Sequence, residues 1–299
     1  MGTPGFAAAT LERLYREGYY IAGVFTQPDK PRNRGMKVSF SAVKELAISN
    51  GTPVYQPALL KNGEADDIVR ELECELIVVV AYGNLLPRDL LSIPTFGCVN
   101  LHGSLLPKYR GAAPVQWAVL NGERETGVST MRMAEELDTG DVFMSKKTEI
   151  GEDETMGELY GRLCVIGSDL LCDTIAAISA GTATCTPQDH REATYAPSLR
   201  KNMSPIDWAQ SALSIKNKVR GLNPWPVATA EFGGLVYKVF AVDISGEIAK
   251  GRNPGDIIET GKNGLEVACA DGTVLIKELQ APGGKRMAAA DYLRGHRIV

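Results

Sequence analysis

The first 180 residues alternate continuous apolar runs with segments of helical periodicity, and this alternation constrains the fold more than any other feature. The clearest runs are LIVVVAY at 76–82 and CVNLH at 98–102. Apolar residues have helical spacing at 7–15, 43–47 and 68–72, and strand-like segments at 128–133 and 142–147 precede a helical segment at 156–177. Continuous apolar strands separated by helices are typical of a parallel sheet covered on both faces. We therefore predict a doubly wound, mostly parallel α/β domain.

A polar segment at 182–206 separates this region from a second one with a different pattern. It is interrupted by prolines and lacks periodicity, as linkers do. A helical segment at 208–220 then precedes five short strand-like runs at 227–232, 236–242, 255–260, 265–268 and 273–279. Short strands separated by glycine-containing turns indicate a small closed barrel, with a β-sandwich as the alternative. We predict domains at 1–181 and 207–299, joined by a linker at 182–206.

Composition excludes several classes of protein. Hydrophobic residues make up 44% and charged residues 23% of the 299 residues, which is a globular balance. No apolar run reaches the ~18 residues of a membrane-spanning helix, and the first residues have no leader pattern, so we expect a cytoplasmic protein. The six cysteines lie far apart with no C-x-x-C pair, and the chain has three histidines. We therefore expect reduced thiols and no metal site.

The chain opens on an unusual turn. The string GTPGFA at 2–7 has the form of a strand-to-helix turn, yet only Met1 stands before it. We expect that the natural gene product carries several more residues upstream, which supply the strand that this turn requires.

Asn100 and His102 are the first candidates for chemistry. They are two positions apart in a predicted strand, so their side chains leave the same face near the carboxyl end, where open α/β sheets place their sites. An amide can donate to a developing oxyanion, and an imidazole can exchange a proton near neutral pH. Asp138, in a later loop, can fix the tautomer of His102 and stabilise its charged form. The trio predicts acyl transfer without a covalent nucleophile; the alternatives are a structural polar pair and a turn in which Asp138 caps backbone amides.

Several longer sequence motifs, some of which contain these three residues, indicate a protein family. The chain contains GTPGFA, TQPDKPRNRGMK, VVAYGNLLP, NLHGSLLPKYRGAAPVQWA, ELDTGD, LNPWP and GGKRMAAADYL. With these strings it resembles the methionyl-tRNA formyltransferase family along essentially its whole length. The resemblance implies a Rossmann-like formyltransferase domain followed by an OB-like barrel that binds tRNA. The implied activity is transfer of the formyl group of 10-formyltetrahydrofolate to the amine of methionine on initiator tRNA.

The resemblance also implies roles for individual residues. Asn100, His102 and Asp138 match the catalytic positions, which implies direct attack by the amine, an intermediate held by Asn100 and His102, and proton movement assisted by Asp138. The positions implied for the folate are Ser104, Leu105, Leu106 and Pro107, with Tyr82 and Gly83 bordering the same pocket. The positions implied for the tRNA are Arg34 and Lys37, in an insertion at 26–38, and Lys108 and Arg110, beside the site.

Other functions stay open at this point. Folate-dependent formyltransferases that act on a phosphoribosyl amine or an amino sugar nucleotide would share the same trio without needing a tRNA domain. A nucleotide-binding oxidoreductase is disfavoured because GTPGF is no G-x-G-x-x-G fingerprint. A non-catalytic RNA-binding protein would not need the intact trio. We expect a monomer whose partners are initiator methionyl-tRNA and a folate, with no membrane contact and no metal.

Overall fold

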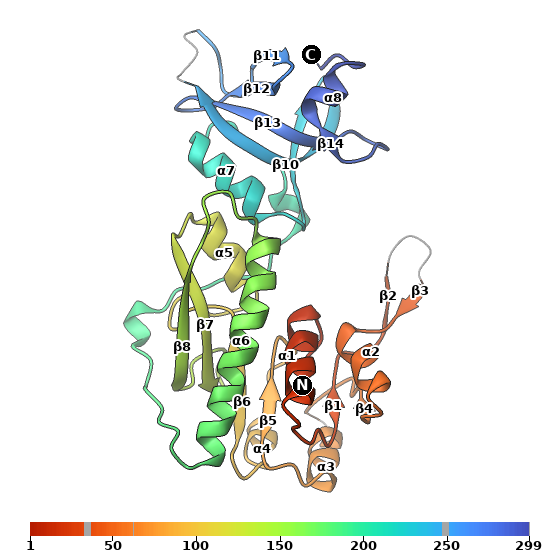
Figure 1. Ribbon diagram of the computed structural model, residues 1–299, viewed down its shortest axis with the longest axis vertical. Coiled ribbons are helices and arrows are strands. Elements are labelled where there is room, and N and C mark those ends of the chain that lie inside the picture. Colours follow the sequence, from red (N-terminus) through yellow and green to blue (C-terminus); the bar gives the residue numbers. More distant parts are fainter. Residues whose placement is uncertain (33–36, 62, 247–250, 299) are drawn as a thin grey trace. The chain divides into compact units, whose positions relative to one another are not determined.

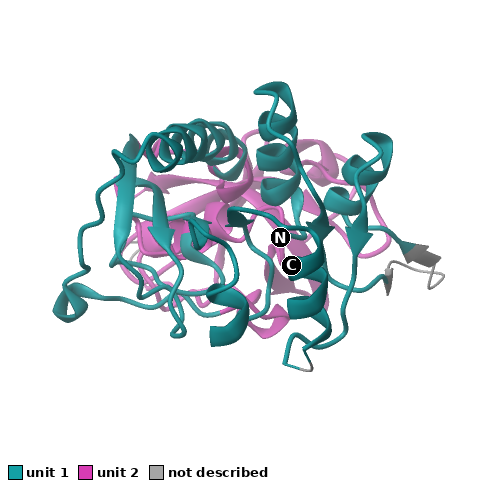
Figure 2. Cartoon of the chain, turned by 90° about the horizontal axis from the view of Figure 1, so that it is seen from below, with its two compact units in different colours: residues 1–114, 125–148, 160–197 teal, residues 115–124, 149–159, 198–299 magenta. Residues whose placement is uncertain are grey.

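The computed structural model describes residues 1–32, 37–61, 63–246 and 251–298 (Figure 1). The chain divides into two compact units (Figure 2). Unit 1 comprises residues 1–114, 125–148 and 160–197, and unit 2 comprises residues 115–124, 149–159 and 198–299. The domain boundaries expected at 181 and 206 stay a prediction. None of the helices in the described ranges is long and apolar enough to cross a membrane.

The sheet of unit 1 is built around β6 (Cys98–His102), the strand expected at these residues. β6 runs parallel to β5 (Ile77–Val79) and antiparallel to β7 (Glu125–Arg132), and β8 (Val142–Glu149) completes the order β5-β6-β7-β8. A second, parallel pair consists of β1 (Val24–Phe25) and β4 (Val54–Tyr55). The apolar run at 76–82 is a strand only over three residues, because the chain turns at Ala81, whose φ is +45°.

Met1 and Gly2 connect the two groups of strands. The Gly2 amide donates to the Phe25 carbonyl at 2.9 Å, and the Val80 amide donates to the Met1 carbonyl at 2.9 Å. A Cβ atom at Gly2 would lie 2.4 Å from the Cβ atom of Ala7, so glycine is needed where helix α1 (Gly5–Arg16) follows this closely. The expected strand-to-helix turn is therefore present at residues 2–5.

Helices cover both faces of this sheet, as predicted (Figure 1). On one face, α1 and α6 (Met156–Ser179) pack Leu14 and Leu171 against Val99 of β6. On the other face, α3 (Glu64–Glu71) and α4 (Arg88–Leu91) belong to a cluster that includes Cys98 of β6. Because side chains alternate along a strand, Asn100 and His102 share the face of Cys98. The remaining elements of unit 1 are α2 (Ala42–Ser49), β2 (Lys30–Arg32), β3 (Lys37–Ser39) and the 3₁₀ turn η1 (His190–Glu192).

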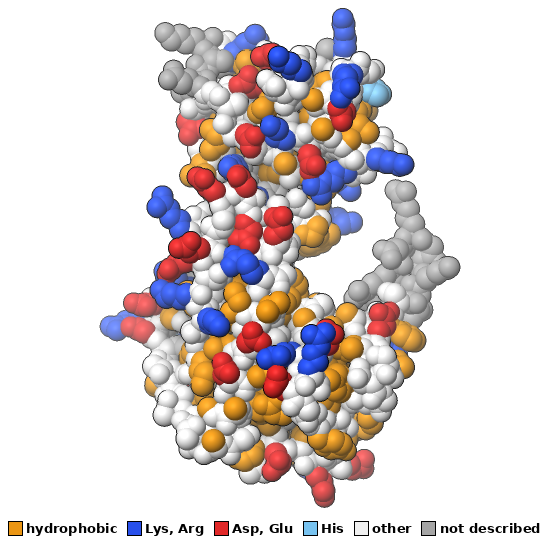
Figure 3. Space-filling view, viewed as in Figure 1, with side chains coloured by type: hydrophobic (Ala, Val, Ile, Leu, Met, Phe, Trp, Pro, Cys, Tyr) orange, Lys and Arg blue, Asp and Glu red, His pale blue; other side chains and the backbone are white. Residues whose placement is uncertain are grey.

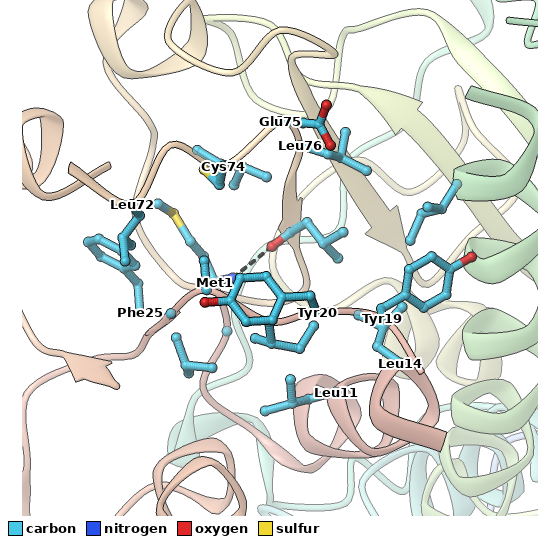
Figure 4. Close-up of a pocket in the computed structure, with 18 of the residues that line it drawn as sticks. Met1, Leu11, Leu14, Tyr19, Tyr20, Phe25, Leu72, Cys74, Glu75 and Leu76 are labelled. Carbon is cyan, nitrogen blue, oxygen red and sulfur yellow. Dashed lines mark hydrogen bonds between the residues drawn. The ribbon is translucent and has the colours of Figure 1, made fainter. Parts of the chain in front are cut away.

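An apolar cavity of about 390 Å³ lies in unit 1, lined by residues of α1, β1 and β5 (Figure 4). The Met1 side chain extends toward Leu72, and Leu11 lines another part of the cavity. The backbone nitrogen of Met1 donates to the Val78 carbonyl at 2.7 Å. Asn100, His102 and Asp138 are not among the lining residues.

Unit 2 contains an antiparallel sheet. Its strands follow the order β11-β12-β13-β10-β9, with β14 paired to β13. Bulges in the pairing of β10 with β13, such as the one between Val239 and Ala241, bend the sheet. Among the described residues no pairing joins β9 to β11, so the backbone hydrogen bonds of the OB-like sheet do not close it into a barrel there. The strands are β9 (Ala228–Phe232), β10 (Leu235–Gly246), β11 (Ile257–Gly261), β12 (Gly264–Ala268), β13 (Thr273–Gln280) and β14 (Met287–Ala288).

Helix α7 (Ala212–Gly221) packs Ile215 and Val219 into the core of this unit. It begins four residues later than the helical segment expected from 208, because Ser211 caps it by accepting from the Ser214 amide at 3.1 Å. The other helices here are α5 (Pro114–Leu120), α8 (Ala289–Leu293) and the 3₁₀ turn η2 (Lys201–Met203). The five strands expected in this region are confirmed, and β14 was not expected.

Candidate active site

Asn100 and His102 lie at the carboxyl end of β6, where the ladder fixes their direction. Asn100 is opposite Val79 of β5 and Met131 of β7, and His102 is opposite Ser129 of β7. His102 is buried and Asn100 is half-buried. The pairing on both sides of the strand keeps the two side chains on one face, as their spacing predicts.

Asp138 reaches this face from the loop between β7 and β8. Its φ is +55°, a left-handed conformation that aspartate tolerates better than most residues. One carboxylate oxygen, Oδ1, accepts from Nδ2 of Asn100 at 3.5 Å, and the other, Oδ2, lies 3.6 Å from Nδ1 of His102. Oδ2 also accepts from the backbone amide of Gly111 at 2.7 Å. The structure thus brings the three expected residues together around one buried carboxylate.

The backbone of Tyr109 determines the tautomer of His102. Nε2 of the ring lies 2.9 Å from the Tyr109 carbonyl oxygen. Because a carbonyl can only accept, Nε2 must carry a hydrogen and donate it. Nδ1 is therefore the ring nitrogen left to exchange a proton, and it is the one that faces Asp138.

The segment expected to contact a folate is a tight turn anchored to β7. The Ser104 hydroxyl is fully buried and donates to the Lys108 carbonyl at 2.6 Å, so it holds the turn together from within. The Ser129 hydroxyl donates to the Ser104 carbonyl at 2.8 Å and accepts from the Leu106 amide at 3.2 Å. The Leu106–Pro107 peptide bond is cis. Leu105, Leu106 and Pro107 remain half-buried, so part of each side chain reaches the surface.

Tyr82 and Gly83 form a second turn, after β5. Tyr82 is buried, and its carbonyl accepts from Nε2 of Gln27 at 3.2 Å and from the Thr3 hydroxyl at 3.3 Å. Gly83 has a φ of +89°, which glycine adopts without strain. Gln27 and Thr3, which the sequence did not single out, therefore fix this turn.

The four residues expected to contact tRNA differ in their surroundings. Lys108 is exposed next to the site. Arg110 is only 2% exposed, and its guanidinium donates to Oε1 of Gln188 from Nε at 3.1 Å and from Nη2 at 2.7 Å. This burial contradicts the expectation that Arg110 reaches an RNA phosphate. Lys37 belongs to β3, and Arg34 lies outside the described residues.

Gln188 and Thr194 are two further residues of the site that the sequence did not reveal. Thr194 accepts from the Tyr109 amide through its hydroxyl at 2.9 Å, and its carbonyl accepts from the Arg110 amide at 2.8 Å. Both residues lie in the segment expected to be a linker, whose polar composition gave no sign that it packs against the site. Within the described ranges, no group of three or more His, Cys, Asp or Glu residues could hold a metal ion.

Fold and site together define a class of protein. Residues 1–175 match the family model of the formyl transferase domain, and residues 198–297 match that of the formyl transferase C-terminal domain. The fold is also that of a solved N-formyltransferase from Helicobacter canadensis, in complex with folinic acid and dTDP-3-aminofucose, with a TM-score of 0.67 at 18% identity over 92% of this chain and 96% of that one. The chain is thus built as a formyltransferase.

Relatives that match over nearly their whole length show which kind of formyltransferase this is. A methionyl-tRNA formyltransferase from Acetivibrio thermocellus is 47% identical over 298 residues, which is 100% of this chain and 96% of the relative. Another, from Trichlorobacter lovleyi, is 47% identical over 296 residues, which is 99% of this chain and 93% of the relative. The chain belongs to the methionyl-tRNA formyltransferase family.

Proposed function

We propose that this enzyme transfers the formyl group of 10-formyltetrahydrofolate to the α-amine of methionine on initiator methionyl-tRNA. One observation carries the proposal: an amide, an imidazole and a carboxylate converge within 3.6 Å at the carboxyl end of β6. The relatives that match along their whole length support the choice of substrates, since they are methionyl-tRNA formyltransferases. Because formyl transfer to methionyl-tRNA belongs to the start of protein synthesis, we propose that the protein acts in the cytoplasm, and we propose further that it acts as a monomer.

The reaction is a direct transfer. The neutral amine of methionine attacks the formyl carbon, the new C–N bond forms, and the carbonyl oxygen becomes an oxyanion. One amide hydrogen of Asn100 points to Asp138, and because an amide nitrogen carries two, the second can donate to this oxyanion. Oxyanion donors of this kind act where charge develops in the transition state.

Proton transfer completes the exchange. The attacking nitrogen must lose a proton, and the folate nitrogen must gain one before its bond to the formyl carbon breaks. His102 exchanges protons through Nδ1, which faces Asp138, while Nε2 keeps its hydrogen and donates it to the Tyr109 carbonyl. In its protonated form Nδ1 can also donate to the oxyanion. The products are formylmethionyl-tRNA and tetrahydrofolate.

The folate is proposed to lie against the turn at residues 104–107, bordered by Tyr82 and Gly83. Leu105 packs on Gly127 of β7: a Cβ atom added at Gly127 would lie 2.5 Å from Cδ2 of Leu105. This packing holds an apolar, half-buried wall beside the trio, which suits a flat ring system. Ser104 supports the wall from inside rather than contacting the ligand with its hydroxyl.

The tRNA is proposed to contact Lys108, and Arg34 and Lys37 in the insertion at 26–38. On the face that Figure 3 draws, basic and acidic side chains are interspersed over both units. Such a distribution is consistent with a few local phosphate contacts rather than with one strongly basic surface.

A second candidate function is formylation of an amino sugar nucleotide, favoured by the fold shared with the Helicobacter canadensis enzyme. Incubation with 10-formyltetrahydrofolate and, in parallel, methionyl-tRNA, an amino sugar nucleotide or glycinamide ribonucleotide separates the candidates. We expect formyl transfer to the tRNA. Transfer to either small amine, with none to the tRNA, would overturn the proposal.

A further inference from the structure

The side-chain amide of Gln188 makes four hydrogen bonds inside unit 1. The residue is 8% exposed. Its Oε1 atom accepts from Nε and Nη2 of Arg110, at 3.1 and 2.7 Å. Its Nε2 atom donates to the backbone carbonyls of Asp138 and Gly140, at 3.0 and 2.6 Å. Both hydrogens of the amide nitrogen and both acceptor positions of the oxygen are thus used.

The chemistry of the neighbours fixes the orientation of this amide. A guanidinium can only donate and a carbonyl can only accept, so the oxygen must face Arg110 and the nitrogen must face the turn at 138–140. A glutamate side chain has the same length and would still pair with Arg110. It would place a carboxylate oxygen against two carbonyl oxygens, where only a donor is favourable.

These contacts hold Asp138 from two sides. Gln188 binds its carbonyl, and the Gly111 amide binds its carboxylate at 2.7 Å. Arg110 and Gly111 are consecutive, so one short segment supports both contacts, and Ala196 in turn donates its amide to the Arg110 carbonyl at 2.7 Å. The left-handed backbone of Asp138, with a φ of +55°, needs such support because it costs energy for any residue with a side chain.

We propose that Gln188 is a positioning residue for Asp138: it holds the turn at 138–140 so that the carboxylate reaches Asn100, His102 and Gly111. This inference rests on the proposed function, in which the carboxylate of Asp138 faces Nδ1 of His102, the atom that exchanges protons. Gln188 touches no reacting atom, because its four side-chain hydrogen bonds go to the Arg110 guanidinium and to two backbone carbonyls. Its effect on the reaction must pass through the geometry of Asp138.

The test compares the variants Q188E, D138N and the double variant in steady-state formylation of methionyl-tRNA. We expect Q188E to lower kcat by about 10- to 100-fold, since misplacement of a catalytic group by about 1 Å costs up to about 100-fold. The KM values for tRNA and folate should stay within about twofold. If Gln188 acts through Asp138, the double variant should be no slower than D138N, because the two changes are coupled.

Control variants separate positioning from folding. Q210E makes the same change at an exposed glutamine of unit 2 and should leave kcat unchanged. Q188N, which is shorter by one methylene, tests the same contacts if Q188E folds poorly, and thermal unfolding of each variant measures folding directly.

An additive loss in the double variant, or a wild-type kcat in folded Q188E and Q188N, would overturn the positioning role of Gln188 while the role of Asp138 stands. A wild-type kcat in D138N would overturn both.

Discussion

Nε2 of His102 lies 2.9 Å from the carbonyl oxygen of Tyr109, so a backbone group, not a side chain, sets the tautomer of this imidazole. Tyr109 itself has a left-handed φ of +59°, and its amide is bound by the Thr194 hydroxyl at 2.9 Å. The orientation of the ring therefore depends on the segment around Thr194, which lies far from His102 in sequence. Variants of that segment should alter the site without touching a reacting group.

The oxyanion role of Asn100 gives the first prediction. Asn100→Ala should lower kcat by about 100- to 1,000-fold, the usual cost of removing one oxyanion donor. The half-buried position of the side chain predicts little loss of folding stability. Single-turnover formylation at saturating tRNA and folate measures the chemical step. A rate within about tenfold of the wild type would contradict the role.

Thr194 is predicted to stabilise the turn that holds His102. Thr194→Val keeps the shape of the side chain but removes the hydroxyl that accepts from the Tyr109 amide, in a hydrogen bond that is partly buried. Loss of such a bond costs about 0.5–1.5 kcal/mol of unfolding free energy. Thr194→Ser retains the hydroxyl and is the matched control. Urea unfolding of both variants checks the difference, and equal stability would refute it.

Cys98 gives a prediction for alkaline pH. Burial raises the pKa of its thiol from 9.0 to about 12. Between these values the unfolded chain loses the proton and the folded chain keeps it, so stability is complete below pH 9 and falls as pH rises. From pH 8 to pH 10 this one thiol should account for about 1.4 kcal/mol of the fall.

Cys98→Ala should remove that contribution. Its unfolding free energy is to be measured in urea at pH 8 and at pH 10, beside the wild type. Only the difference between the two pH values matters, because the lost packing affects both equally. The same decline in both proteins would show that the thiol ionises equally well in the folded state.

The sequence predicts the parts of this site that depend on local spacing. Asn100 and His102 could be placed on one face because a strand has a period of two, and the five strands of unit 2 could be found from their glycine-containing turns. The approach of Asp138 depends on a left-handed backbone that residue type alone does not fix. It also depends on Gln188, which lies 50 residues further along the chain. Such contacts between distant residues leave no periodic signal.

The sequence also shows which residues are charged without showing which of them are buried. Lys108 and Arg110 are two positions apart in PKYRG and looked equivalent as phosphate contacts. The structure separates them, since Lys108 is exposed and Arg110 is almost completely buried. The turn at Tyr109, with its positive φ, directs the chain so that Arg110 lies on Gln188 instead of the surface.

This difference gives the last prediction. Lys108→Ala should weaken tRNA binding and reduce the slope of log K against log salt by about 1, because one phosphate contact is lost. The KM for the folate and the folding stability should not change. Arg110→Met should instead leave the salt slope as it is and lower the unfolding free energy, because Gln188 keeps a buried oxygen without its donors. Titration of tRNA binding against salt, beside urea unfolding, checks both variants. A reduced salt slope in Arg110→Met, at unchanged stability, would show that this guanidinium leaves its buried position to bind the RNA.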